Sequence, residues 1–494
     1  MSWSEFWTTL LVALLGILLL VKLLKTNQRF SGLPPGPTPL PLVGNVFQLN
    51  LKSVHKSLIK LSEQYGPVFT FWFSGYPAVV VCGTEAVREV LVTHGHDFSG
   101  RYLFPILERI SNGYGVAFSS GERWKQLRRF TLSTLRDYGM GKKSIEERIQ
   151  EEAQFLVTSF RNKKGGPFKA DFPLRCATSN IICSIAFGER FDYEDQSFLK
   201  RMGMIAQVIR VLSSPWAQLY NNFPRIMNFL PGPHQKFFQN ITSIKSFLSK
   251  TIQSHKEVHQ KDFPRDYIDT FLNKMDEEKN ELNSEFNQEN LLLTTLNLFL
   301  AGTETTSTTL HWSIQILAKY PEIQETIHGE IDDVIGPNRS PKAEDRAKMP
   351  YTDAVIHEVQ RYIDIAPMSI PHMAMSDVRF REYLIPKGIY VIPVLSSVLK
   401  EAGHWETPES FNPSHFLDEK GCFKKSESFL AFSAGKRMCL GESLARMELF
   451  LFLTTLLQNF VIEPVIDRKD IDTSPVTSGF LVVPRSYEFH AISR

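Results

Sequence analysis

Hydrophobic residues recur with helical spacing along most of this chain and alternate in only three short regions. Spacings of three and four residues predict helices over 84–94, 121–137, 145–161, 173–186, 241–257, 289–318, 321–335, 351–363 and 440–457. Alternating β-branched and aromatic residues predict a hairpin over 67–82, turning at Ser74-Gly75, and strands in 376–395 and near 478–491. Within 376–395, the stretch 383–390 reads as strand, turn, strand. We therefore expect a mainly α-helical body with small β-sheets.

The N-terminal segment predicts a membrane anchor. Residues 6–21 carry no charge, and with Lys22 extending toward water the apolar run approaches the roughly 20 residues that cross a bilayer. A cleaved signal peptide is the alternative. Against it, the residues before the run include Glu5 but no basic residue, and no small-residue cleavage site follows the run. Basic residues follow the run at Lys22, Lys25 and Arg29. They predict a luminal N-terminus and a cytosolic body.

Five prolines between residues 34 and 41 exclude a helix there and favour a stiff, extended linker. The predicted organisation is an anchor over 1–25, a basic and proline-rich linker over 26–45, and one catalytic body over 46–494. The apolar, turn-rich segment 223–233 either dips into the membrane surface or packs inside the body.

Composition narrows the function classes. A net charge of +2 over 494 residues gives no overall bias toward nucleic acid. The five cysteines stand at 82, 176, 183, 422 and 439 without a C-x-x-C pair, so a structural zinc site and a disulfide framework are both disfavoured.

The segment 291–320 is long and apolar enough to suggest a second membrane span. Asn297, Glu304 and the threonines and serine of 303–309 oppose that interpretation, because polar groups are costly in a bilayer. A buried central helix is expected instead. Its Ala301-Gly-Thr-Glu-Thr-Thr306 stretch combines a helix-weakening glycine with hydroxyls that compete for backbone carbonyls. This predicts either a local kink with room for oxygen and water or a capped threonine cluster.

Cys439 lies in Phe432-Ser-Ala-Gly-Lys-Arg-Met-Cys-Leu-Gly441, directly before a predicted helix. Gly435 and Gly441 suit a tight loop that turns or lies against a flat group. Amides at the start of the helix favour sulfur as an anion, and Arg437 suits a carboxylate partner. A cysteine before a helix is by itself more often a small buried hydrophobe, so the loop alone leaves both interpretations open.

Glu358 and Arg361 are three residues apart and can pair on one helical face, as many surface residues do. His357-Glu358 also begins a zinc-hydrolase H-E-x-x-H pattern, but Arg361 stands where the second histidine is required. A zinc hydrolase is therefore excluded.

The pattern F-x-x-G-x-R-x-C-x-G resembles the cysteine loop of the cytochrome P450 superfamily, and Glu358, Arg361 and the 301–306 stretch resemble its other motifs. PPGPTPLPLVGN, W-x-x-x-R and AFGERF resemble the microsomal family-2 branch, where His415 in FNPSHF is also common. The resemblance implies a long central helix over haem b, a β-rich N-terminal lobe, Cys439 as the iron ligand and a structural pair of Glu358 with Arg361. The implied haem contacts are Arg101, Trp124, Arg128, His372, Phe432, Gly435, Arg437 and Gly441.

The resemblance also implies an unspecific-type monooxygenase in which Thr305, supported by Glu304, directs proton delivery during dioxygen activation. Electrons would come from NADPH through cytochrome P450 reductase, with cytochrome b5 as a second partner, because no nucleotide-binding G-x-G-x-x-G occurs here. Lys125, Arg129 and Lys436 are either a docking face or ordinary solvated cations. The implied location is the endoplasmic reticulum membrane.

The implied substrates are lipophilic: fatty acids, steroids or foreign compounds. The implied substrate pocket comprises Phe104, Phe118, Phe299, Ala301, Ala366, Ile370 and Phe480. Two other functions stay open at this point: a haem-thiolate isomerase or dehydratase without a reductase, and a non-catalytic membrane-tethered haem protein.

Overall fold

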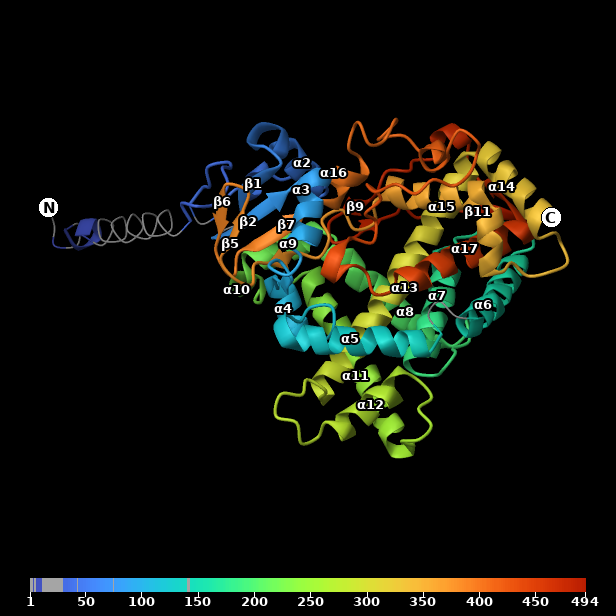
Figure 1. Ribbon diagram of the computed structural model, residues 1–494, viewed down its shortest axis with the longest axis horizontal. Coiled ribbons are helices and arrows are strands. Elements are labelled where there is room, and N and C mark those ends of the chain that lie inside the picture. The colour runs from blue at the N-terminus through green and yellow to red at the C-terminus, as the bar shows by residue number, and fades with distance from the viewer. Residues whose placement is uncertain (1–2, 4–5, 11–29, 42, 74, 140–142) are drawn as a thin grey trace.

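The computed structural model describes residues 3, 6–10, 30–41, 43–73, 75–139 and 143–494 (Figure 1). Most of the predicted anchor lies outside these residues. Within them, no helix combines the length and the apolar character that a bilayer crossing requires. The described body has a strand-rich part on the side where the N-terminus lies and a larger helical part beyond it.

The main sheet has five strands in the order β1-β2-β7-β4-β3. Their bounds are β1 Val68–Phe73, β2 Tyr76–Val81, β3 Gly100–Arg101, β4 His372–Met373 and β7 Tyr390–Pro393. The predicted hairpin over 67–82 is confirmed, with Val68 opposite Val81 and Phe73 opposite Tyr76. Only β2 and β7 are parallel to each other in this sheet. The sheet therefore brings segments from the first hundred residues against segments near residue 380.

Three two-stranded sheets complete the β structure. They pair β5 Val378–Phe380 with β6 Tyr383–Ile385, β8 Phe460–Pro464 with β11 Phe489–Ser493, and β9 Thr477–Ser478 with β10 Val482–Val483. Strands occur where the sequence predicted them in 376–395. The two strands read from 383–390 nevertheless do not pair with each other, because β6 joins β5 while β7 joins the main sheet.

All nine predicted helical segments are helical. The helices are α2 Val54–Tyr65, α3 Thr84–Arg88, α4 Pro105–Ser111, α5 Gly121–Asp137, α6 Lys143–Arg161, α7 Asp171–Ala186, α8 Gln196–Leu212, α9 Pro215–Asn222, α10 Pro224–Met227, α11 Pro233–Val258, α12 Tyr267–Glu277, α13 Gln288–Lys319, α14 Pro321–Val334, α15 Pro350–Ile363, α16 Leu395–Leu399 and α17 Glu442–Asn459. A π-helical turn, Glu89–Thr93, follows α3, and short 3₁₀ turns include η4 Pro413–Phe416 and η5 Gly435–Arg437.

Several helices were not predicted, although α8 and α12 each bury one apolar face and carry an N-terminal aspartate cap. Asp195 caps α8 by accepting hydrogen bonds from the backbone N–H groups of Ser197 and Phe198. The predicted start of α11 at 241 was wrong, since the helix begins at Pro233, a residue type that favours a first helical turn.

Helix α13 crosses the middle of the helical part (Figure 1). Most of its side chains are buried. Asn290 Oδ1 accepts from the backbone N–H of Gly115, and Asn297 Oδ1 accepts from that of Ala117. The predicted central helix is confirmed, and several of its polar groups have partners within the body, while a buried polar atom is left without a partner in Thr294, Thr303, His311, Trp312 and Gln315.

Candidate functional site

The cysteine loop is held in shape by its own backbone and by the end of α3. The backbone N–H of Cys439 donates to the carbonyl oxygen of Phe432 at 3.0 Å. Gly435 has φ +68, and a Cβ there would collide with the carbonyl oxygen of Leu91 in the π-helical turn. Glycine is therefore required at 435 by close approach as well as by conformation.

Gly441 stands in a different setting. Its φ of −93 suits any residue, and no protein atom lies within 4 Å of where a Cβ would stand. Burial raises the pKa of the Cys439 thiol, although the backbone N–H groups of Gly441 and Glu442 and the charge of Arg128 act to lower it. At the start of α17 the backbone N–H groups and Arg128 thus favour the anionic sulfur, but burial outweighs them.

Three buried or half-buried guanidinium groups gather beside this loop. Arg437 donates to the carbonyl oxygens of Ser99 and Ser119, each at 2.7 Å. Arg101 donates to the carbonyl of Ile370 at 2.6 Å, and Arg128 to that of Met438 at 2.7 Å. Within the described part of the chain, none of the three pairs with a carboxylate.

This concentration of positive charge has an electrostatic cost. Burial, together with the charges of Arg101 and Arg128, lowers the pKa of Arg437 to about 7. Burial and the charge of Arg128 lower the pKa of Arg101 to about 9. An anionic group bound among these cations would relieve their repulsion and restore their ordinary protonation.

Further buried polar atoms of the same region have no protein partner: Trp124 Nε1, Arg101 Nε, His372 Nε2 and Ser433 Oγ. Arg101 and His372 stand opposite each other on β3 and β4, and His372 Nδ1 contacts the carbonyl oxygen of Phe98 at 2.7 Å. Buried polar atoms without partners are rare, so their convergence here indicates a ligand. Cationic donors beside a cysteine sulfur fit haem b, whose propionates such donors could bind.

The 301–306 stretch of α13 exposes Ala301 and turns Glu304 into the core. Thr305 Oγ1 donates to the carbonyl of Ala301 at 2.7 Å, and Glu304 forms an ion pair with Arg175 of α7 at 2.5 Å. Helix α13 continues through this stretch without interruption, and the local kink stays a prediction. Gly302 has another role: a Cβ there would stand about 3 Å from Ile182, so glycine permits α7 to pack closely.

Arg175 and Glu448 are neighbours of this stretch that the sequence did not single out. Glu448 lies on α17 and is hydrogen-bonded to Thr306; burial raises the pKa of its carboxyl group to about 8. An isolated glutamate within the apolar run 447–453 was the available signal for Glu448. The sequence around Arg175 offered no such signal, since the role of Arg175 depends on which helix lies beside α13.

Glu358 and Arg361 form a fully buried, bidentate ion pair with N···O distances of 2.7 and 2.8 Å. Arg361 also donates to the carbonyls of Leu399, Pro408 and Ser410. His415 contacts the same carboxylate through Nδ1 at 3.2 Å and accepts from the backbone N–H of Thr407 through Nε2. This pattern makes Nδ1 the protonated nitrogen, so His415 joins the network as a neutral donor.

The predicted pocket residues do not share one environment. Phe118, Ala366 and Phe480 are half-buried at the edge of the main core, and Ile370 is half-buried beside Arg101. Phe104 packs edge to face against Tyr102 and Tyr390. Phe299 is 1% exposed, and its ring packs on Phe187 and Phe247 between α13, α7 and α11; its place in a substrate pocket stays a prediction.

Comparison with known proteins agrees with this geometry. The family model described as Cytochrome P450 matches residues 34–491. The chain therefore belongs to the cytochrome P450 family, and it is a monooxygenase of that haem-dependent class. It is of the family 2 type, as shown by similarity to Cytochrome P450 2C55 of Mus musculus, 51% identical over 484 residues that cover 98% of this chain and 99% of the relative. Cytochrome P450 2C41 of Canis lupus familiaris and 2C5 of Oryctolagus cuniculus are each 51% identical, covering 97% of this chain and 98% of the relative.

Proposed function

We propose that this protein is a membrane-anchored haem-thiolate monooxygenase that hydroxylates or epoxidises lipophilic substrates with electrons from NADPH. The single observation that supports it best is the set of unpaired donors and cations around the Cys439 loop. No other group of residues in the described chain offers a sulfur and converging carboxylate-binding donors together.

Cys439 would ligate the haem iron, and Arg101, Trp124, Arg128, His372 and Arg437 would hold the propionates. Phe432, Gly435 and Gly441 would shape the loop around the macrocycle. When bound, haem b supplies dioxygen activation and insertion of one oxygen atom, chemistry that protein side chains cannot perform. His372 Nδ1 faces the carbonyl oxygen of Phe98, so Nε2 is the nitrogen left for a propionate. Burial and the charges of Arg101 and Arg437 lower the pKa of His372 well below its usual value, and a bound anion would oppose that shift.

Thr305 would pass protons to the reaction from its position on the face of α13 that also exposes Ala301. Its hydroxyl donates to the Ala301 carbonyl, so its oxygen lone pairs stay free to accept a hydrogen bond from water. Glu304 would act through its charge and its hold on Arg175, since its carboxylate faces α7. The proton path therefore depends on the junction of α13 with α7.

Phe118, Ala301, Ala366, Ile370 and Phe480, with Phe104 at the sheet side, would form the substrate pocket. Their apolar side chains suit fatty acids, steroids and foreign lipophiles and offer few polar anchors. Lys125, Arg129 and Lys436 are all exposed on α5 and η5, the elements joined by the bond from Arg128 to Met438. They would dock the acidic surface of the reductase or cytochrome b5.

The proposed location is the endoplasmic reticulum membrane, with 1–25 as anchor, 26–45 as linker and 46–494 as the cytosolic catalytic body. The segment 223–233 supports a second membrane contact, because Ile226, Phe229 and Leu230 are 61%, 90% and 45% exposed. Apolar side chains this exposed are typical of interaction surfaces.

Spectroscopy followed by turnover tests the proposal. Reduced protein treated with carbon monoxide is expected to give the red-shifted absorption band of a thiolate-ligated haem, and Cys439→His is expected to lose it. Turnover of polyunsaturated fatty acids, steroids and foreign lipophiles would then be measured with reductase and NADPH, with and without cytochrome b5. A thiolate band without NADPH-dependent product would favour the isomerase or the non-catalytic haem protein, and absence of the band would contradict the proposal.

A further inference from the structure

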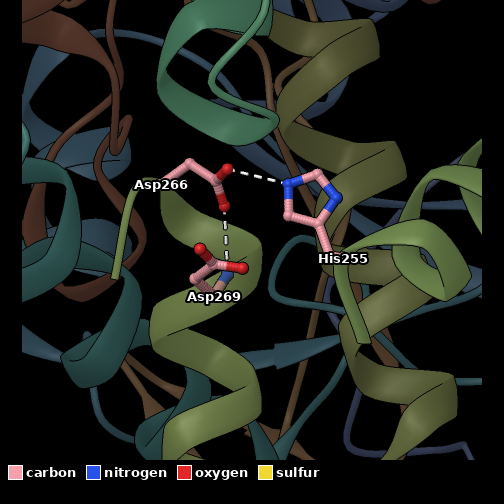
Figure 2. A group of neighbouring side chains, drawn as sticks. All are labelled: His255, Asp266 and Asp269. Atoms are coloured by element: carbon pink, nitrogen blue, oxygen red, sulfur yellow. Dashed lines mark hydrogen bonds and ion pairs between the residues drawn. The ribbon is translucent and has the colours of Figure 1, made fainter. Parts of the chain in front are cut away.

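Two histidines and two aspartates meet where α11 ends and α12 begins. Figure 2 shows His255, Asp266 and Asp269, whose candidate ligand atoms all lie within 4.8 Å of one another. His255 Nε2 lies 2.8 Å from Asp266 Oδ2, and His259 Nδ1 lies 3.7 Å from Asp269 Oδ1. The four residues form an H-x-x-x-H pair and a D-x-x-D pair on either side of one loop.

The orientation of the His255 ring is that of a metal ligand. Its Nδ1 lies 2.8 Å from the carbonyl oxygen of Thr251, so Nδ1 carries a proton. Histidines that bind metals commonly donate the second ring N–H to a backbone carbonyl, which fixes the tautomer and aims the other nitrogen at the ion. Figure 2 shows His255 Nε2 directed in this way at the carboxylate of Asp266, beside Asp269.

His259 supplies an independent observation. Neither of its ring nitrogens has a hydrogen-bond partner, although both atoms are buried. A network of hydrogen-bonded ion pairs accounts for His255, Asp266 and Asp269, whereas His259 has only the longer, 3.7 Å approach of Nδ1 to Asp269. Buried imidazole nitrogens are normally satisfied, so this side chain indicates a partner that is not part of the protein chain.

Arg265 is the competing cation. It holds Asp269 through two bonds of 2.7 and 3.1 Å, while Asp266 also caps α12 by accepting from the backbone N–H of Asp269. The Arg265 side chain is 51% exposed, so it can leave Asp269 for water without burying a charge. An arriving ion would replace Arg265 and the Nε2 proton of His255, and the charge of the site would stay balanced.

We propose that His255, His259, Asp266 and Asp269 form a structural site for a divalent transition metal, with Zn²⁺ as the best match. Two imidazoles and two carboxylates suit zinc, which accepts nitrogen and oxygen donors in four-coordinate sites, whereas Ca²⁺ and Mg²⁺ prefer oxygen ligands alone. The ion would tie the end of α11 to the first turn of α12 and order the loop between them. The proposal is independent of the monooxygenase activity.

The test compares Zn²⁺ binding in four forms of the full-length, haem-loaded protein after chelator treatment. His259→Leu removes a ligand that holds no hydrogen bond, so it leaves the hydrogen-bonded pairs of His255 with Asp266 and of Arg265 with Asp269 intact. Arg265→Met removes the competing cation. His328→Leu, which removes another histidine with a buried, unpartnered nitrogen, is the matched control.

Bound zinc per chain would be measured by equilibrium dialysis against Zn²⁺ alone, together with the melting temperature. Wild type and His328→Leu should each retain one more zinc ion per chain than His259→Leu. The affinity of His259→Leu for Zn²⁺ should be about tenfold to a hundredfold lower than that of wild type. Arg265→Met should bind more tightly, and zinc should raise the melting temperature of every form except His259→Leu. Equal zinc retention and equal melting shifts in wild type and His259→Leu would overturn the proposal and leave the four residues as an ion-pair network. His259→Gln serves as a second variant if the leucine form does not fold.

Discussion

Arg437 lies over the indole ring of Trp124, with its Cζ 3.8 Å from the ring centroid. The contact joins the cysteine loop to α5. It places Trp124 Nε1, which has no protein partner, close to the Arg437 guanidinium. A guanidinium stacked on an aromatic ring keeps its charge available in the ring plane, where carboxylates bind. The Arg437–Trp124 contact therefore fixes the cysteine loop relative to the donors that we propose bind the propionates.

Replacing Arg437 should weaken haem retention. Arg437→Met keeps an unbranched side chain but loses the guanidinium that lies over Trp124 and donates charge-assisted hydrogen bonds, so we expect haem loss at least about tenfold faster. The rate of haem transfer to an excess of a haem-scavenging apoprotein would measure it. Arg468→Met, at an exposed arginine of a 3₁₀ turn, is the control and should match wild type. Equal transfer rates in both variants would exclude Arg437 from the haem contacts.

Breaking the Glu358–Arg361 pair should destabilise the fold. Arg361→Met leaves a buried carboxylate with His415 and the backbone N–H of Asn412 as its remaining partners. We expect a loss of about 3–5 kcal/mol in the free energy of unfolding, read from urea denaturation followed by circular dichroism. Lys274→Met removes a partly exposed cation paired with Glu277 and Glu278 and should cost no more than about 1 kcal/mol. Similar small losses in both variants would show that the buried pair is dispensable.

Thr305→Val should uncouple NADPH consumption from product formation. The variant keeps the size of the side chain but cannot relay a proton, so product per NADPH is expected to fall about tenfold or more. Substrate dissociation constants should change little. Thr295→Val removes a hydroxyl that makes the same bond to its i−4 carbonyl on the same helix, and it should leave coupling unchanged. If Thr305→Val and Thr295→Val gave the same product per NADPH, the proton-relay role of Thr305 would be contradicted.

Glu448 should make stability depend on pH. Burial raises the pKa of its carboxyl group to about 8, above the usual value near 4.5, so the folded state holds the proton more tightly than the unfolded state. The neutral carboxyl group contributes stability that is fully present below about pH 4.5 and is lost as pH rises through about 8. Glu448→Gln should remove this loss, and melting temperatures at pH 5 and pH 8 would measure it. If the melting temperatures of Glu448→Gln and wild type differed by the same amount at pH 5 and at pH 8, the raised pKa of Glu448 would be contradicted.

Local patterns allowed a large part of the fold to be predicted. Periodicity located α5, α6, α13 and α15, and alternation located the hairpin of β1 and β2, because these signals reflect which faces are buried. Helices α8 and α12 were missed although each buries one apolar face and begins at an aspartate cap. The motif around Cys439 and the pair Glu358–Arg361 were recognised from their resemblance to family motifs, because spacing alone left their roles open.

The sequence by itself determined the residue types that chemistry requires: the cysteine at the start of a helix, the glycines of its loop, and the arginines and tryptophan that can bind carboxylates. Only the tertiary structure decided which of them meet. Arg101 and His372 become neighbours through pairing of β3 with β4, Glu304 turns toward Arg175, and Phe299 is drawn into the core. Strand pairing and helix packing bring together residues far apart in the chain, and no local pattern encodes those distances.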